Sequence, residues 1–163
     1  MTKKIKTLFL IICASLFFVS GCNKEMSREE KAEAFVERAL TAPDEKLSEI
    51  AASNTTIKEE EMKAAMDDLL GDFVSKETKE NSSLIIYQEL LVFQTMAAFS
   101  DKEFKVVDVK IKAHNDSNYS YTATVETNYS EDNVEITGNI QFDDDNYINY
   151  MTILIDPDPF LPE

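Results

Sequence analysis

The spacing of apolar residues changes once along this 163-residue chain, close to Glu103. Before that residue, apolar side chains recur every three or four positions, which is the spacing of one face of an α-helix. After it, apolar and polar residues alternate, which is typical of a strand with one buried face. Helices followed by an antiparallel sheet form the α+β pattern, in which the helices cover one face of the sheet.

The first half predicts three short amphipathic helices. Ser27-Arg28-Glu29-Glu30 has the form of a capping box, which opens the first helix. Pro43 suits the first turn of the second helix, and Thr56-Ile57-Lys58-Glu59 is a capping box for the third. Gly71 suits the end of the third helix. The buried faces are expected to be Ala32, Phe35, Val36, Ala39 and Leu40; then Leu47, Ile50 and Ala51; then Met62, Ala65, Met66, Leu69 and Leu70.

Residues 84–99 are the most apolar stretch after the N-terminal segment, and they follow a polar connection at residues 75–83, part of which could extend a helix. We expect a largely buried helix with a narrow polar stripe, although a strand at residues 84–87 before a shorter helix fits the run equally. The stripe would hold Gln88, Glu89, Gln94 and Thr95. Phe93, Met96 and Phe99 are expected in the core.

Four strands are predicted in the second half. Residues 119–129 and 134–142 alternate strictly, residues 104–111 contain a Val106-Val107 pair that indicates a bulge or a change of face, and residues 147–155 are apolar on both sides. Turn-forming residues separate them at 114–118, 130–133 and 143–146. We therefore expect a four-stranded antiparallel meander.

The N-terminus has the three parts of a secretory signal peptide. Lys3, Lys4 and Lys6 precede an apolar run of twelve residues at 8–19, which is shorter than the roughly 20 residues that span a bilayer. The run closes with Val19-Ser20-Gly21-Cys22, which resembles the lipobox of bacterial lipoproteins. This resemblance implies cleavage between Gly21 and Cys22 and a lipid anchor on Cys22. An ordinary signal peptide with an incidental cysteine is the alternative.

Cleavage would leave residues 22–27 as a tether, residues 28–155 as one domain and residues 156–163 as an extended tail. Residues 1–21 carry three of the 16 basic residues and none of the 31 acidic ones, so the net charge would change from −15 to −18. Such a charge repels nucleic acid and suits cations, basic proteins or neutral ligands. The anchor would hold the protein on the outer face of the cell membrane. With Cys13 removed and Cys22 acylated, no disulfide is available.

The order of elements over residues 26–155 is similar to that of the cone-shaped domains of the nuclear-transport-factor-like and cystatin-like superfamilies. In those domains, N-terminal helices pack into a curved antiparallel sheet. Small lipoproteins of Gram-positive bacteria are also similar, and the absence of Trp fits such a source. Folds of this kind include enzymes, binding modules and assembly parts, so the resemblance implies an architecture without an activity.

The sequence contains few motifs typical of catalytic sites. His114 is its only histidine, and it lies in a predicted turn, where a solvated side chain is expected. Asp143, Asp144 and Asp145 offer the oxygen ligands that calcium prefers, but without the spaced loop of a calcium site, so a hairpin turn is the favoured interpretation. No cofactor is expected.

Six tyrosines are the remaining candidates for a ligand pocket, because each combines an apolar ring with a polar tip. Packing in the core or at its edge is the favoured alternative. These residues are Tyr87, Tyr119, Tyr121, Tyr129, Tyr147 and Tyr150.

We therefore expect a non-enzymatic lipoprotein that binds a protein or a small ligand close to the membrane. One alternative is an immunity or superinfection-exclusion lipoprotein that blocks a toxin or a phage, since a strongly acidic surface suits a basic toxin. Another is a small hydrolase or isomerase that uses paired carboxylates. A buried Asp or Glu with a raised pKa would favour the enzyme.

Overall fold

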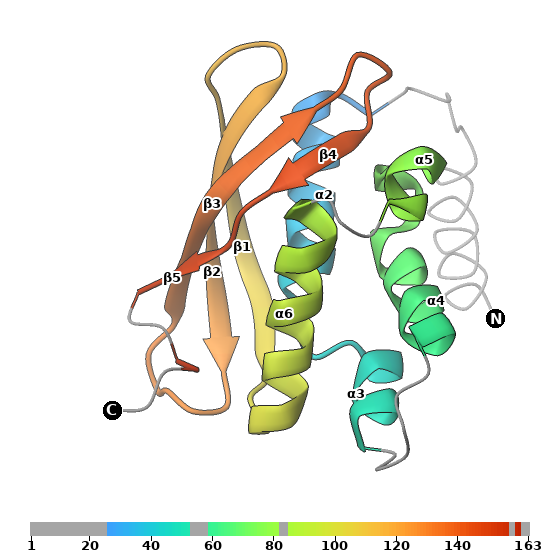
Figure 1. Cartoon of the computed structure of the whole chain (residues 1–163). Helices are drawn as coiled ribbons and strands as arrows, with labels where there is room; N and C mark the ends of the chain where they lie inside the picture. Colours follow the sequence, from blue (N-terminus) through green and yellow to red (C-terminus); the bar gives the residue numbers. More distant parts are fainter. Residues whose placement is uncertain (1–25, 53–58, 82–84, 157–158, 161–163) are drawn as a thin grey trace, which may run out of the picture.

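The computed structural model describes residues 26–52, 59–81, 85–156 and 159–160. It has the expected α+β architecture, with helices on one face of a five-stranded antiparallel sheet (Figure 1). Helices α2 and α6 pack on the sheet, and α3 and α4 lie on their far side. In the described residues, no helix is long and apolar enough to cross a membrane. The helices are α2 (Arg28–Leu40), α3 (Glu45–Ala52), α4 (Glu59–Leu70), the 3-10 turn η1 (Gly71–Phe73), α5 (Lys76–Glu80) and α6 (Ile85–Ser100).

Helix α2 begins as predicted. The Ser27 hydroxyl accepts the Glu30 N–H at 3.2 Å, and the Glu30 carboxylate accepts the Ser27 N–H at 2.8 Å, which completes the capping box. All five residues expected on its buried face are buried. This face packs against β1, because the helix lies across the inner side of that strand.

Helix α3 begins later than predicted. Pro43 precedes the helix, and Asp44 caps it by accepting the N–H groups of Lys46 and Leu47 at 3.0 and 3.2 Å. The Asp44 side chain satisfies donors at the helix start that no helical carbonyl can reach, so it sets the boundary. Leu47 is buried as expected. The capping box predicted at residues 56–59 lies largely outside the described residues.

Helix α4 buries the five apolar residues assigned to it. It ends at Gly71, whose φ of +53° is the left-handed conformation that glycine adopts without strain. Part of the polar connection that follows is helical, since the Ser75 hydroxyl caps α5 by accepting the Thr78 N–H at 3.1 Å.

Helix α6 differs from its prediction in which side chains it buries. Phe93 is buried as expected, whereas Met96 and Phe99 are 38% and 64% exposed. Gln94, assigned to the polar stripe, is fully buried. Apolar side chains occur on most sides of α6 itself, so their spacing in the sequence did not define a single buried face.

The sheet follows the predicted meander in the order β1-β2-β3-β4, with the expected bulge between Val106 and Asp108. Its last strand was predicted as one continuous element but divides at Thr152 into β4 and β5, both paired with β3. The Thr152 carbonyl lies where a side chain at Gly138 would be, 1.9 Å from an ideal Cβ, and accepts the Tyr121 hydroxyl at 2.8 Å. The strands are β1 (Phe104–Ala113), β2 (Asn118–Thr127), β3 (Val134–Phe142), β4 (Ile148–Met151) and β5 (Leu154–Ile155).

Candidate functional site

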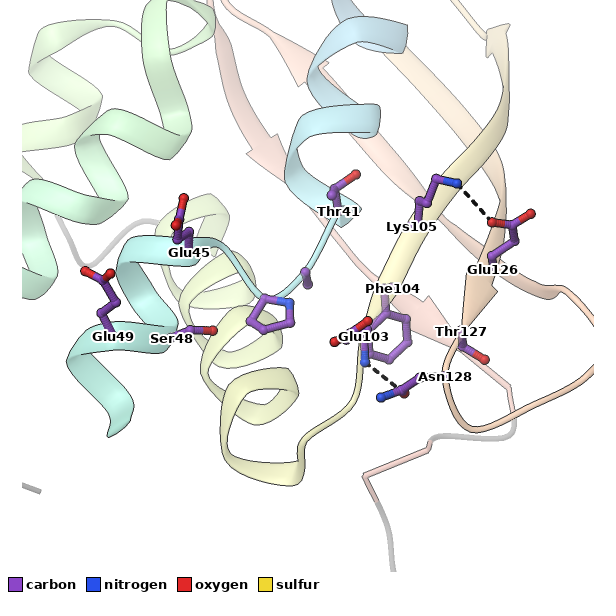
Figure 2. Close-up of a pocket in the computed structure, with 12 residues that line it drawn as sticks. Thr41, Glu45, Ser48, Glu49, Glu103, Phe104, Lys105, Glu126, Thr127 and Asn128 are labelled. Carbon is purple, nitrogen blue, oxygen red and sulfur yellow. Dashed lines mark hydrogen bonds and ion pairs between the residues drawn. The ribbon is translucent and has the colours of Figure 1, made fainter. Parts of the chain in front are cut away.

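An open groove of about 690 Å³ lies between α3 and the first part of the sheet (Figure 2). One wall comes from α3, with Glu45, Ser48 and Glu49. The opposite wall comes from β1 and from the end of β2, and residues 41–43 and Phe104 lie between the walls. The second wall consists of Glu103, Lys105, Glu126, Thr127 and Asn128.

The base of the groove is a short backbone pairing between segments distant in sequence. The Ala42 N–H donates to the Phe104 carbonyl at 2.9 Å, and the Phe104 N–H donates to the Ala42 carbonyl at 2.7 Å. Both residues are buried, with 4% and 1% of their surface exposed. The connection between α2 and α3 is therefore fixed to the edge of β1, which makes the base of the groove apolar and rigid.

A buried glutamine holds the same connection from the other side. Gln94 Oε1 accepts the Asp44 N–H at 2.7 Å, and Gln94 Nε2 donates to the carbonyls of Ala39 and Thr41 at 2.9 and 3.2 Å. A buried amide is tolerated only when its donors and acceptor are bonded, as they are here. The sequence analysis missed this role. The position of Gln94 in the sequence could have indicated burial. It lies four residues after Leu90 and three before Ala97, so it shares a helix face with these two fully buried residues.

The walls of the groove carry a net negative charge. Glu45, Glu49, Glu103 and Glu126 are all exposed there, against a single lysine. That lysine, Lys105, pairs with Glu126 at 3.2 Å (Figure 2). Walls of one charge sign concentrate ions of the opposite sign between them, so the groove favours a cationic ligand over an anionic one.

The strand wall also offers polar atoms. The Asn128 amide bridges two backbone groups, accepting the Glu103 N–H at 3.0 Å and donating to the Asp101 carbonyl at 2.9 Å. Thr127 Oγ1 is buried and has no hydrogen-bond partner within the described part of the chain. Its burial keeps this hydroxyl out of contact with the groove, so the exposed polar atoms of the strand wall belong to its other residues.

The acidic side chains of the groove are all at its surface. Glu45, Glu49, Glu103 and Glu126 are exposed and can therefore contact a ligand that enters from solvent. Four other residues in the described part of the chain have a shifted pKa. A hydrogen bond and the nearby charge of Lys46 lower the pKa of Asp68, and Asp68 raises the pKa of Lys46 in turn. Burial raises the pKa of Tyr119 and of Tyr121.

The structure does not place the six tyrosines together at one exposed surface. Tyr87, Tyr119 and Tyr121 are buried core residues, with 6%, 4% and 2% of their surface exposed, so the prediction of a tyrosine-lined pocket gains no support from them. Tyr129 is 39% exposed and its ring packs edge-on against Phe104. Two others lie half-buried: Tyr147, whose ring is 4.9 Å from Lys31 Nζ, and Tyr150 on β4.

The polar turns hold the side chains expected in them. Asp143 Oδ1 accepts the Tyr147 N–H at 2.8 Å, which closes the turn between β3 and β4, while Asp144 and Asp145 are exposed. Within the residues that the structure covers, no group of three or more acidic, histidine or cysteine side chains is arranged to hold a metal ion. His114 is exposed and lies 2.9 Å from the Ser120 hydroxyl. Gly21 and Cys22 lie outside the described residues.

Comparison with known proteins adds no further constraint. The sequence matches no protein-family model, no curated protein and no solved structure. The groove and its charge are therefore the basis for assigning a function.

Proposed function

We propose that this chain is a lipoprotein on the outer face of the cell membrane, where it binds a protein partner without catalysing a reaction. The observation that carries the binding role is the groove between α3 and the sheet. It combines a buried apolar base at Ala42 and Phe104 with exposed glutamates on both walls. An extended segment with apolar residues and a flanking Lys or Arg fits this combination.

The anchor is supported by the lysines, the short apolar run and Cys22 in the sequence. It also agrees with the position of the groove. The start of α2 is fixed to one end of the domain, because the Arg28 guanidinium donates to Asn146 Oδ1 at 3.0 Å and to the Asp116 and Asp143 carbonyls at 2.6 and 3.1 Å. The groove lies at the opposite end of α2, because residues 41–43 between its walls directly follow the last residue of that helix.

With the proposed anchor, this arrangement predicts which end of the domain a partner meets. A tether of residues 22–27 spans at most about 20 Å, so the Arg28 end would lie next to the bilayer. The groove would then face away from the membrane and remain open to a partner. Anionic headgroups would also be separated from the acidic groove, which reduces their mutual repulsion.

The anchor is tested by replacing Cys22→Ala in the full chain and following palmitate labelling and membrane fractionation. We expect loss of labelling and release from the membrane, because the acylated sulfur is removed. Cys13→Ala is the matched control and should leave both unchanged. Labelling that persists in Cys22→Ala would contradict the proposal.

The binding role is tested by chemical crosslinking in intact cells followed by mass spectrometry. We expect protein adducts whose crosslinked peptides include residues of the groove walls. A domain that instead copurifies with a small molecule, and yields no protein adduct above background, would require a ligand-binding function in place of a protein-binding one.

A further inference from the structure

Helix α6 exposes an apolar surface that the groove does not use. Ile85, Val92 and Phe99 are 48%, 60% and 64% exposed, and Met96 is 38% exposed. Leu154 on β5 is 61% exposed and lines a cavity of about 220 Å³ together with Val92. We call these five residues the α6 patch. In Figure 1 the helix lies at the front of the molecule, with its outer side away from the sheet.

The spacing of the α6 patch suits helix pairing. Ile85, Val92 and Phe99 are separated by seven residues each, so they line one seam of the helix. Side chains at this spacing meet their equivalents when two such helices pack in the same direction. Each apolar residue would then contact its own copy across a two-fold axis.

Charge indicates which partner can approach this seam. The chain is 29% charged with a net charge of −15, yet α6 contains a single Asp, Glu, Lys or Arg, which is Glu89. Its carboxylate accepts the Ile153 N–H at 3.3 Å, which directs it toward the chain's own backbone. Two copies of an acidic protein repel each other where their negative charges come close. Along α6 the repulsion would be small, because this helix carries so few charges.

We propose that the α6 patch pairs with the same patch of a second copy, with the two α6 helices parallel. The direction rests on the proposed function, because two copies anchored in one leaflet have their Arg28 ends on the same side. An antiparallel pair would reverse one copy and move its tether away from the membrane.

The size of the patch predicts how strong this pairing is. Five partly exposed side chains provide apolar surface on the order of 500 Å², whereas a stable interface buries about 800 Å² on each partner. The contact is therefore weak in solution. Confinement to a membrane raises the effective concentration of the copies, so the dimer forms where the chains are anchored.

Cysteine crosslinking of the full chain in membranes tests the proposal. Ile85→Cys, Val92→Cys and Phe99→Cys are each oxidised with copper phenanthroline and separated without reductant. We expect each variant alone to give a disulfide-linked dimer of twice the chain mass. The yield should exceed that of Thr137→Cys, an exposed control on the outer face of the sheet, by about tenfold. The unsubstituted chain controls for its own cysteines.

Three results would overturn the pairing. The first is a yield no higher than that of Thr137→Cys for all three variants. The second is a pattern in which Val92→Cys dimerises alone, but Ile85→Cys and Phe99→Cys form a dimer only when mixed with each other, which indicates antiparallel helices. The third is an adduct of another mass, which indicates that a different protein covers the patch.

Palmitate labelling of the same samples separates this inference from the proposed function. Labelled chains that give no specific dimer contradict the pairing and leave the anchor intact. Unlabelled chains that give the three parallel dimers contradict the anchor and support the pairing.

Discussion

Gln94 Oε1 accepts the backbone N–H of Asp44 at 2.7 Å, and this bond joins the middle of α6 to the residue that caps α3. The Asp44 side chain in turn accepts two N–H groups at the start of α3. Glu45 and Glu49 belong to that helix and form one wall of the groove. The position of the acidic wall therefore depends on a fully buried amide on a different helix.

Replacing Gln94 with Leu should destabilise the domain by about 2–4 kcal/mol, because one N–H donor and two carbonyl acceptors lose a partner in a buried or part-buried position. Denaturant unfolding would measure the loss. Gln88→Leu is the matched control, because Gln88 is exposed on the same helix and should change the free energy of unfolding by less than about 0.5 kcal/mol. Equal effects of the two substitutions would show that the buried amide does not hold the connection.

The two glycines of the described domain should respond very differently to alanine. Gly138→Ala places a Cβ 1.9 Å from the Thr152 carbonyl oxygen and 2.7 Å from the Tyr121 ring, so it should cost about 3 kcal/mol or more, or prevent folding. Gly71→Ala strains a backbone with φ of +53° and should cost about 1 kcal/mol. Thermal unfolding of both variants measures the difference. If the Gly138→Ala variant were as stable as the Gly71→Ala variant, the Thr152 carbonyl would not pack against Gly138 as described.

Tyr121 should make the domain sensitive to alkaline pH. Burial raises its pKa above the ordinary value of about 10, so the folded state keeps the phenol proton that the unfolded state releases. The resulting stability is complete below about pH 10 and is lost as the pH rises further. Tyr121→Phe should reduce this alkaline slope by up to about 1.4 kcal/mol per pH unit.

The slope is measured by denaturant unfolding between about pH 9 and about pH 11, one unit either side of the ordinary tyrosine pKa of about 10. Tyr129→Phe is the control, because that ring is 39% exposed. An unchanged slope in Tyr121→Phe would contradict the burial of this phenol.

Arg28 should stabilise the end of the domain nearest the proposed tether. Its guanidinium donates to two turns and lies 5.5 Å from the Phe142 ring centre, so Arg28→Leu should cost about 1–3 kcal/mol. Amide hydrogen exchange should become faster in both turns, at residues 114–118 and 143–146. Lys112→Leu, an exposed change on β1, should leave these rates unaltered. Unaltered exchange rates of these two turns in Arg28→Leu would show that Arg28 does not stabilise them.

Local sequence signals predicted the parts of the fold that depend on neighbouring residues. The capping box at Ser27, the buried faces of α2 and α4, the end of α4 at Gly71 and the bulge near Val106 were all confirmed. Each depends on residues a few positions apart, whose spacing or backbone conformation is visible in one sequence.

The remaining features depend on contacts between distant segments. The base of the groove depends on the pairing of Ala42 with Phe104. The last strand is interrupted where the Thr152 carbonyl packs directly against Gly138. Neither pairing leaves a local pattern. Met96 and Phe99 were wrongly assigned to the core because α6 is apolar on most sides, so composition alone could not distinguish its buried face from its exposed one.

The central claim is that the acidic groove binds a protein. The most direct measurement places a photo-crosslinking amino acid at Ser48, inside the groove, in the full chain expressed in cells. We expect a discrete protein adduct that decreases by about tenfold in a Glu45→Lys/Glu49→Lys background, because reversed charges repel a basic segment. It should persist in Glu60→Lys/Glu77→Lys, which makes the same charge change at exposed residues outside the groove lining. No adduct at Ser48, or equal loss in both backgrounds, would contradict the groove as the binding site.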